Sequence, residues 1–493
     1  MKTSIPKLIQ NAPHNGPLYE KVLGALQNAI ADGTLPPATR LPSERDLAEE
    51  LGISRTTVTT AYGELESRGL VRGHVGRGTF VCAPTQVEDA PFAWRGKVST
   101  RVQRNSDRDF HDLLLDSVNP ALISFAAGCP ALDCFPFDEY QRIAQQVMRR
   151  DAVRILGNAP AEGQSALRRA LASRLEVKPE NVLVVSGSQQ ALDLLARCLL
   201  DPGDTVLTER PTYVGAIRSF RAAGASMVGW DVRRGDLDEL EDLILRYRPK
   251  LFYVNPTFQN PTGRTLSLRE RRDLLKLAAR YRLPVIEDDA YRELYYDAPA
   301  PQPLRELDEH NIVIYLNTFS KVMAPGLRLG WIVASESIVD QLAEIKLTMD
   351  HFTEGLGQLV VAEMLRSGLF DHHLKQVRTE HRKRRDALVS ALRRGLPQRT
   401  LEFNVPGGGM YLWCRLARHM ESRALLRVAM AAGVVFASGD LFYADPSGAR
   451  ELRLCYSALP VERIEEGVRR LARCMESAEF RRAPVERQSL PMV

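Results

Sequence analysis

Lys321 is the residue whose surroundings best suit covalent chemistry. It ends the segment Thr318-Phe319-Ser320-Lys321, which follows the apolar run Ile312–Leu316, and no other lysine lies between Lys276 and Lys346. A lysine just past a strand end and flanked by hydroxyl groups can be kept desolvated enough to form a Schiff base with an aldehyde. Taken alone, the segment also suits a solvated loop lysine, so other residues must decide between the two.

A phosphate site is indicated close to this lysine in the expected fold. Ser186-Gly187-Ser188-Gln189 joins the apolar run Val182–Val185 to an amphipathic segment, so Ser188 and Gln189 are expected to open a helix. The free N–H groups and the positive dipole end of a helix N-terminus attract an anion. Arg328, in Pro325-Gly326-Leu327-Arg328, can add a charged fork to the same phosphate.

Polar residues that suit a pyridine ring occur at further strand ends and turns. Asp288 directly follows the predicted strand Pro284–Glu287 and can stabilise a ring cation, while Asn260 and Tyr291 can bond a ring hydroxylate. Tyr213 can lie flat against a ring. Each residue also has a plain structural interpretation, as a strand-end acid, a turn or a core tyrosine, so the set is informative only jointly.

Arg453 is predicted to point into the protein. It alternates with Leu452 and Leu454 on a predicted strand, and an inward arginine needs an anion such as a ligand carboxylate or a structural acid. The segments around it predict the fold. From about residue 116, short apolar runs alternate with helix-length amphipathic segments, which favours an α/β body with a largely parallel sheet. After about residue 338, long helices and a few strands predict a smaller α+β subdomain.

Residues 17–81 predict three helices followed by a β-wing. Ser43 and Ser54 are predicted as the N-caps of the second and third helices, with only a short turn between the two helices. Arg55, Thr56 and Thr57 occupy the outward N-terminal turns of the third helix, where a major groove is read. The glycine-rich, basic segment Gly73–Val81 has the pattern of a tight wing that suits the minor groove or the DNA backbone. A small docking domain with solvated arginines is the alternative that periodicity alone leaves open.

The head resembles the GntR family of bacterial winged-helix repressors. The likeness rests on Leu41-Pro42-Ser43-Glu44-Arg45-Asp46-Leu47-Ala48, on Gly52-Ile53-Ser54-Arg55-Thr56-Thr57-Val58 and on the wing. It implies that double-stranded operator DNA is contacted at the starts of the second and third helices and from the wing. The implied DNA-contacting segments hold Arg45, Ser54, Arg55, Thr56, Thr57, Gly76 and Arg77.

The body resembles the fold-type I, class I/II aminotransferases over about residues 120–475, and the likeness implies pyridoxal 5'-phosphate as cofactor. Lys321 would be the Schiff-base lysine, Asp288 the partner of the pyridine nitrogen, and Tyr213 the stacking residue. Asn260 and Tyr291 would bond the ring oxygen. The implied phosphate and ligand groups are Ser188, Gln189, Ser320 and Arg328 for the phosphate, Arg453 for a ligand carboxylate, and Gly128 beside the ligand.

One departure from the aminotransferase pattern concerns a neighbouring subunit. Where such enzymes usually read Tyr-Gly-Asp-Pro, this chain has Leu156-Gly157-Asn158-Ala159-Pro160. The tyrosine that normally reaches the cofactor phosphate of the partner subunit is therefore missing. This departure puts efficient transamination in doubt, although cofactor binding is still expected.

Length and composition fit this two-part organisation. The chain has 493 residues, a net charge of +5, and 44% hydrophobic and 26% charged residues, as expected of a soluble multidomain protein. Seven cysteines without a C-x-x-C pair fit a reducing cytoplasm, no apolar run is long enough to span a membrane, and His372-His373 lacks a third metal ligand. The expected regions are a DNA-binding domain at 12–82, a linker at 83–115, a cofactor-binding body at 116–478 with its small subdomain from about 338, and a tail at 479–493.

The two likenesses together resemble the MocR subfamily of bacterial regulators. The resemblance implies a cytoplasmic homodimer, with each head crossing to the partner's body, that senses an amino acid or another amino compound by forming an external aldimine. Two alternatives stay open: a working aminotransferase whose head serves only assembly, and a regulator of vitamin B6 supply that senses the cofactor itself.

Overall fold

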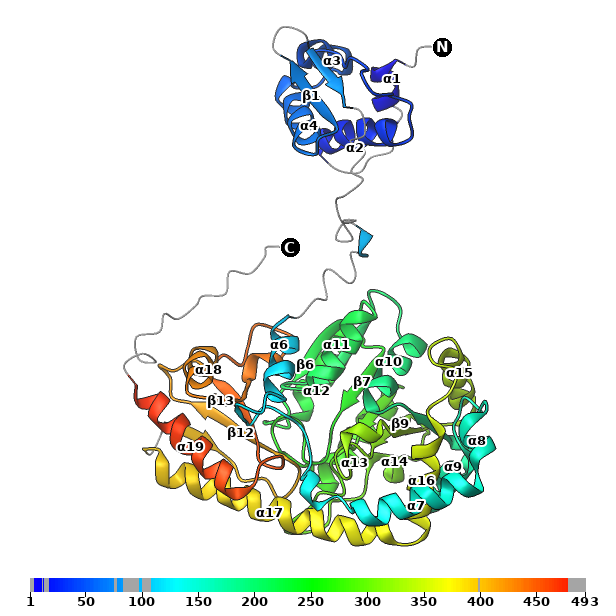
Figure 1. The fold of residues 1–493 in the computed structure, drawn as a ribbon, viewed down its shortest axis with the longest axis vertical. Coiled ribbons are helices and arrows are strands. Elements are labelled where there is room, and N and C mark those ends of the chain that lie inside the picture. The colour runs from blue at the N-terminus through cyan, green and yellow to red at the C-terminus, as the bar shows by residue number, and fades with distance from the viewer. Residues whose placement is uncertain are drawn as a thin grey trace. The chain divides into compact units, whose positions relative to one another are not determined.

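The computed structural model describes residues 4–10, 12, 17–74, 78–82, 97–99, 108–397 and 400–477. The chain divides into two compact units, residues 1–98 and 99–493, which are called here the head and the body (Figure 1). This division falls inside the stretch 83–115 that the sequence predicts as a linker. Within the same stretch, however, helix α6 already begins at Arg108 and runs to Ser117.

The head is a helical cluster with a two-stranded wing. Its core is built from the apolar sides of the helices, with Leu26, Leu47, Val58 and Leu65 fully buried. The strands pair antiparallel, with Val71 opposite Val81. The elements are α1 (Ile5–Gln10), α2 (Leu18–Ala31), α3 (Glu44–Leu51), α4 (Arg55–Ser67), β1 (Val71–His74) and β2 (Gly78–Val81).

Local capping sets the two helices of the predicted DNA-reading turn. Ser43 Oγ accepts the Asp46 N–H at 3.2 Å before α3, and Ser54 Oγ accepts the Thr57 N–H at 3.2 Å before α4. Between them Gly52 ends α3 in the left-handed conformation with φ of 63°, which a glycine adopts without strain. Both predicted N-caps are therefore confirmed, and the turn between the helices is as short as the sequence requires.

The body has a large and a small lobe, each with its own sheet. The large lobe is built around a seven-stranded mixed sheet with the order β4-β10-β9-β8-β7-β5-β6. Only β10 runs antiparallel to its neighbours, so the carboxyl ends of the other six strands share one edge. Ligands of open α/β sheets bind at that edge. The strands are β4 (Val182–Val185), β5 (Thr205–Glu209), β6 (Ser226–Trp230), β7 (Leu251–Val254), β8 (Val285–Asp288), β9 (Val313–Thr318) and β10 (Gly330–Val333).

Helices cover both faces of this sheet (Figure 1), and strand residues alternate between the two layers: Leu183 and Val185 pack with α10, whereas Val182 and Val184 pack with α9 and α16. The helices of this lobe are α7 (Phe137–Arg150), α8 (Ala152–Leu156), α9 (Ser165–Leu175), α10 (Ser188–Leu199), α11 (Val214–Ala222), α12 (Leu237–Tyr247), α13 (Leu268–Arg280), α14 (Leu304–Leu307), α15 (Glu336–Leu347) and α16 (Gly355–Arg366). Helix α15 spans the predicted subdomain boundary at about residue 338 and α16 follows it, yet the apolar faces of both helices join the core of the large lobe.

The small lobe has its own antiparallel sheet, in the order β11-β12-β15-β14. Helices α17 and α19 pack against each other, and Leu388, Leu392, Ile464 and Leu471 bury their side chains in its core. The elements are α17 (Leu369–Gly395), β11 (Leu401–Phe403), β12 (Tyr411–Leu416), α18 (Ser422–Ala431), β13 (Val434–Val435), β14 (Ala437–Ser438), β15 (Glu451–Cys455) and α19 (Val461–Glu476), and β13 also pairs with β3 (Ile123–Ser124).

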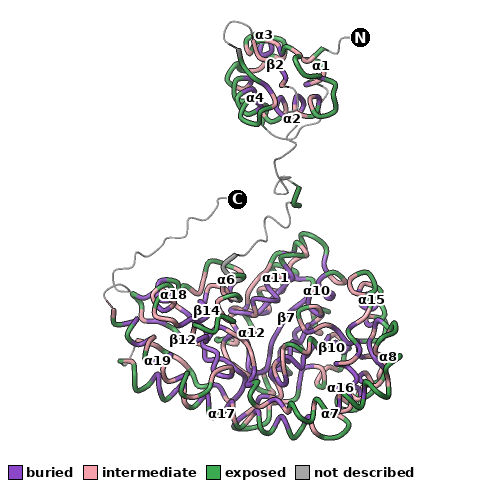
Figure 2. Tube along the Cα trace, in the orientation of Figure 1, coloured by how far each residue is buried: buried purple, intermediate pink, exposed green. Residues whose placement is uncertain are grey.

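Burial follows this layering. The inner strands of the large sheet are buried, its edge strand β6 is mostly half-buried, and the outer sides of the surrounding helices are exposed (Figure 2). Polar side chains that lie inside this apolar body need partners or a ligand. Among the described residues, no helix is long and apolar enough to cross a membrane.

Candidate cofactor site

Lys321 lies at the common carboxyl edge of the strands, three residues after β9 ends. Its Nζ donates to the Gly128 carbonyl oxygen at 2.9 Å, so two segments far apart in the sequence meet there. A Cβ atom at Gly128 would lie 3.4 Å from Lys321 Nζ and 2.5 Å from the Tyr411 hydroxyl. Position 128 therefore has to be a glycine for the lysine and the tyrosine to approach each other.

Asp288 ends the neighbouring strand β8 as a buried acid. Its Oδ2 accepts from the Tyr253 hydroxyl at 2.7 Å, whereas its Oδ1 is buried without a hydrogen-bond partner among the described residues. Burial raises the pKa of Asp288 to about 6, although the hydrogen bond from Tyr253 and the nearby Lys321 ammonium oppose the rise. A buried carboxylate with an unused oxygen suits a cationic ring nitrogen.

Asn260 and Tyr291 meet as the sequence predicts. Asn260 Nδ2 donates to the Tyr291 hydroxyl at 3.3 Å, and that hydroxyl lies 3.3 Å from the Tyr411 hydroxyl. Burial raises the pKa of Tyr291 well above its ordinary value, so the phenol remains protonated and can donate. Tyr411 follows the run Gly407-Gly408-Gly409, and this glycine-rich entry into a strand was the available signal for a residue that the sequence reasoning missed.

Arg453 points inward from β15, as its alternation with leucines predicts. Nη1 donates to Asn260 Oδ1 at 2.9 Å and Nη2 to the Ala126 carbonyl at 2.7 Å, while Nε is buried and finds no partner in the described part of the chain. The guanidinium lies over the rings of Tyr411 and Phe442, 4.1 and 4.9 Å from their centroids. None of these partners carries a negative charge, so the arginine retains the capacity to hold an anion.

Residues that the sequence predicts to bind a phosphate lie around the start of α10. Gly187 is its N-cap with φ of 90°, and a Cβ atom there would lie 2.6 Å from Arg328 Nη2. Arg328 Nη2 donates to the Ser186 carbonyl at 2.9 Å, and the buried Ser320 hydroxyl accepts from Thr318 Oγ1 at 3.0 Å. The first N–H groups of a helix have no partner within the helix, so those of Ser188 and Gln189 can receive an anion.

The side chain of Gln189 is already hydrogen-bonded to other residues of the protein. Its Nε2 donates to the Gly215 carbonyl at 3.1 Å and to Ser219 Oγ at 2.8 Å, and its Oε1 accepts from the Tyr213 hydroxyl at 3.4 Å. At this position only the backbone N–H is left for a phosphate. Tyr213 in turn lies beside the same site, and its hydroxyl is fixed through Gln189.

The predicted DNA-reading residues lie on the exposed side of the head. Arg45, Ser54, Arg55 and Thr56 are exposed and Thr57 is half-buried. Arg55 pairs with Glu44 at 3.5 Å. Gly76 and Arg77 at the wing tip lie outside the described residues.

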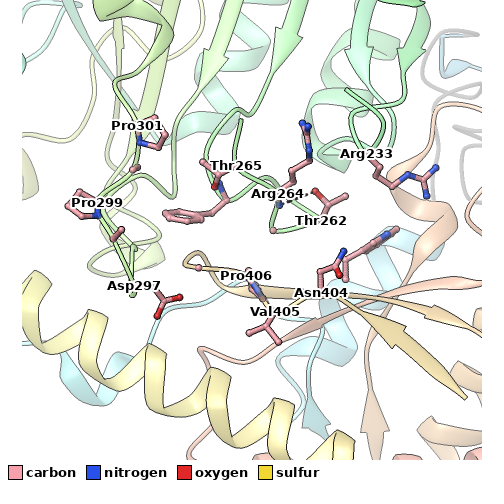
Figure 3. A pocket seen from close by; sticks show the side chains of 16 residues that line it. Arg233, Thr262, Arg264, Thr265, Asp297, Pro299, Pro301, Asn404, Val405 and Pro406 are labelled. Carbon is pink, nitrogen blue, oxygen red and sulfur yellow. Dashed lines mark hydrogen bonds between the residues drawn. The ribbon is translucent and has the colours of Figure 1, made fainter. Parts of the chain in front are cut away.

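A separate cavity of about 550 Å³ is lined in part by residues 262–265, which follow Asn260 in the chain. Figure 3 shows Thr262 and Thr265 of the large lobe across from Asn404 and Pro406 of the small lobe. Lys321, Asp288 and Arg453 are not among its lining residues. This cavity is therefore distinct from the group of residues around Lys321.

Comparison with known sequences identifies both units. The pattern of the family described as "Aminotransferase class I and II" matches residues 123–471, and that of "Bacterial regulatory proteins, gntR family" matches residues 18–81. The chain therefore belongs to the class I and II aminotransferase family and carries a gntR-family head. This combination is the MocR-type architecture: a probable rhizopine catabolism regulatory protein MocR from Rhizobium meliloti is 32% identical over 94% of this chain and 93% of its own length.

Relatives named as aminotransferases match about four fifths of this chain. A 2-aminoadipate transaminase from Thermus thermophilus is 39% identical over 78% of this chain and 98% of its own length. The crystal structure of LysN, an alpha-aminoadipate aminotransferase from the same species, has a TM-score of 0.74 and 37% identity over 78% of this chain and 98% of that one. The large mixed sheet with its smaller lobe is thus the fold-type I aminotransferase fold, which implies pyridoxal phosphate.

The residues present fit that cofactor. The orphaned Asp288 oxygen suits the pyridine nitrogen, and the cradle at Gly187, which a Cβ atom would fill, suits the phosphate. Lys321 lies at the same strand edge as both. Charge, hydrogen-bonding capacity and space therefore agree with the cofactor that the fold implies.

Proposed function

We propose that this chain is a pyridoxal-phosphate-dependent transcriptional regulator that senses an amino acid or another amino compound. The observation that carries the proposal is the convergence of Lys321, the partly unpaired Asp288 and the anion-ready Arg453 in a body joined to a gntR-type head. The cofactor, when bound, supplies an aldehyde that condenses reversibly with primary amines. The proposal therefore links amine chemistry in the body to DNA binding by the head.

The residues of the body divide the work of holding cofactor and effector. Lys321 provides the amine that the effector competes with, and Asp288 holds the proton on the ring nitrogen. Asn260 and Tyr291 bond the ring oxygen, Tyr213 covers the ring, and Ser320, Arg328 and the N–H groups of Ser188 and Gln189 bind the phosphate.

Arg453 selects the effector by its charge. Because its current partners are neutral oxygens and aromatic rings, a carboxylate adds the one interaction that they do not supply. Gly128 leaves room beside Lys321 for the ligand. We infer that the preferred effector carries both a primary amine and an acidic group.

The head reads double-stranded operator DNA through the starts of α3 and α4, with Arg45, Ser54, Arg55, Thr56 and Thr57, and through the wing at Gly76 and Arg77. Arg55 is 72% exposed and can leave its surface ion pair at little cost. We further propose a homodimer with exchanged heads and a cytoplasmic location. Val153 and Leu156, exposed to 86% and 87% on and next to the segment that lacks the family's tyrosine, support a body surface covered by a second copy.

The test measures operator binding and cofactor state in the same sample. Operator fragments are titrated by fluorescence anisotropy with cofactor-loaded protein, with and without a panel of amino acids and amines, while the visible absorbance of the cofactor is followed. We expect at least one amino compound to change both the absorbance and the operator affinity by severalfold. Absorbance changes that never alter DNA binding would refute the sensing role.

A second candidate is a working aminotransferase. The 39% identical 2-aminoadipate transaminase favours it, and this chain has the Lys321 and Asp288 that such an enzyme would need, while it lacks the family's tyrosine near Leu156. Release of a keto acid at roughly 1 per second or faster would identify an enzyme. Retention of the amino compound without keto-acid release would identify a sensor. A regulator of vitamin B6 supply would instead change its operator affinity on addition of the cofactor alone.

A further inference from the structure

Lys346 is a buried lysine outside the residues discussed so far. Its side chain is fully buried on α15, which packs on α10 and β4. The described residues give its ammonium one hydrogen-bond partner, Asp350 Oδ1 at 2.7 Å. Burial lowers the pKa of Lys346, and the Asp350 carboxylate opposes this. Burying an ammonium is costly, so the position calls for a specific reason.

The partner of this lysine leads directly to the phosphate loop. Asp350 Oδ2 accepts from Gln190 Nε2 at 2.7 Å and lies 3.4 Å from Ser186 Oγ. Gln190 Oε1 in turn accepts the Ser186 backbone N–H at 2.7 Å. The Ser186 carbonyl, on the other side, is held by Arg328 at 2.9 Å. Every polar group of Ser186 is thus fixed immediately before the Gly187 cap.

The charges of Asp350 and Lys346 affect how well the neighbouring loop can receive a phosphate. Asp350 is an acid one side chain away from a loop that has to receive a phosphate, and an uncompensated carboxylate there would repel the ligand. Lys346 neutralises it while leaving its second oxygen free to hold Gln190 and Ser186. The pair therefore keeps the carboxylate as a hydrogen-bond acceptor and cancels its charge.

We propose that Lys346 and Asp350 are positioning residues that, through Gln190, fix Ser186 and so aim the first N–H groups of α10 at the cofactor phosphate. This inference rests on the proposed binding of pyridoxal phosphate. The pair acts on the phosphate end of the cofactor and leaves the ring end to Asp288 and Tyr291.

Comparing two ligands separates positioning from general stability. The dissociation constants of pyridoxal phosphate and of pyridoxal, which lacks the phosphate, are measured by absorbance for the full-length wild type and for Lys346→Met. We expect Lys346→Met to weaken pyridoxal phosphate about tenfold while pyridoxal changes less than twofold. A shifted ³¹P resonance of the bound phosphate should accompany the loss. The control Lys276→Met removes a lysine that is 78% exposed and 3.9 Å from Asp273, and it should change neither constant.

Two further variants test whether an uncompensated Asp350 carboxylate repels the phosphate. Asp350→Asn removes the repelling charge but weakens the acceptor, so it should lose less affinity than Lys346→Met. The double variant Lys346→Met/Asp350→Asn should recover part of the loss, because no uncompensated acid remains. If Lys346→Met is not soluble, Asp350→Asn and Gln190→Met carry the test, since both break the chain nearer to the loop.

Each outcome has one meaning. An equal loss for both ligands, or no loss for pyridoxal phosphate in any variant, overturns the positioning role. Failure of the wild type itself to bind pyridoxal phosphate overturns the proposed function instead. The two failures are therefore distinguishable in one experiment.

Discussion

The head and the candidate cofactor site place their predicted functional residues in opposite ways. In the head, Arg55, Thr56 and Thr57 lie next to one another on the first turn of one helix, exposed or half-exposed to solvent. In the body, Ala126 and Arg453 are more than 300 residues apart in the chain, and the Arg453 guanidinium donates to the Ala126 carbonyl oxygen in a buried hydrogen bond. A surface reading site of this kind can lose one side chain without disturbing the rest, whereas the buried site depends on each member.

Removing the amine of the body should have the largest effect. Lys321→Ala deletes the side-chain amine that follows β9, and we expect complete loss of the borohydride-trapped cofactor adduct on that position, read by mass spectrometry of the digested protein. Circular dichroism and non-specific DNA binding should be unchanged, because the head folds around its own core. A trapped adduct on any other lysine would show that the site has been misplaced.

Arg453→Met should come next in size. Loss of a charged donor to a ligand carboxylate costs about 2 to 3 kcal/mol, or roughly 30- to 150-fold in the affinity for acidic amino compounds. The affinity for a simple amine without a carboxylate should change little. The matched control is Arg418→Met, which removes an exposed arginine of the same lobe. An equal loss for both ligand types would assign Arg453 a structural role only.

The raised pKa of Asp288 predicts that the stability of the cofactor-free protein depends on pH. Its pKa is raised from 3.8 to about 6, so between these values the folded form holds more protons than the unfolded form, and the free energy of unfolding falls as pH rises. Relative to Asp288→Asn, the fall from pH 4 to pH 7 should be on the order of 2 to 3 kcal/mol in urea titrations. Burial also raises the pKa values of Glu209 and Glu287. The contribution of Glu287 is the same in both proteins, whereas the pKa of Glu209, which the Asp288 charge helps to raise, is slightly lower in Asp288→Asn.

Cofactor loading should remove this difference, because a ring cation favours the charged carboxylate. The comparison between wild type and Asp288→Asn is therefore repeated with saturating pyridoxal phosphate. A pH dependence that persists unchanged after loading would mean that Asp288 does not face the ring nitrogen.

The sequence predicts what depends on local or strand-end position. The caps Ser43 and Ser54 follow from residue type and spacing, and Asp288 and Lys321 follow from the rule that ligands gather where parallel strands end. Contacts across the sheet carry no such signal. Tyr253 reaches Asp288 from the neighbouring strand β7, although in the sequence it is one more member of an apolar run.

The sequence also does not reveal which of several possible hydrogen-bond partners a polar side chain contacts. Gln189 is correctly placed at the start of α10, but its side chain bonds Ser219 and Gly215 of α11, which no spacing within its own segment reveals. Lys346 is similar, because its burial depends on how α15 packs on the large lobe. What escapes the sequence is therefore which of several polar neighbours a side chain chooses.

The head should respond independently of the body. Arg55→Ala should weaken specific operator binding by about 1 to 3 kcal/mol, measured by anisotropy at fixed salt, while the cofactor dissociation constant stays the same. This result would sharpen the contrast between an exposed and a buried site. A parallel loss of cofactor binding would contradict this contrast, because Arg55 would then also affect the cofactor site.

Glu44 offers the smallest and most specific test. Its carboxylate accepts from Thr59 Oγ1 at 2.8 Å and pairs with Arg55 at 3.5 Å, so it competes with DNA for that arginine and repels phosphate. Since exposed ion pairs contribute up to about 1 kcal/mol, Glu44→Gln should tighten operator binding by at most about fivefold. The control Glu64→Gln alters a similar ion pair near the far end of α4, the helix that begins at Arg55, and should leave affinity within about twofold. In an Arg55→Ala background the gain from Glu44→Gln should shrink, because only the repulsion of phosphate is left to relieve, and an undiminished gain would show that Arg55 is not the group that Glu44 restrains.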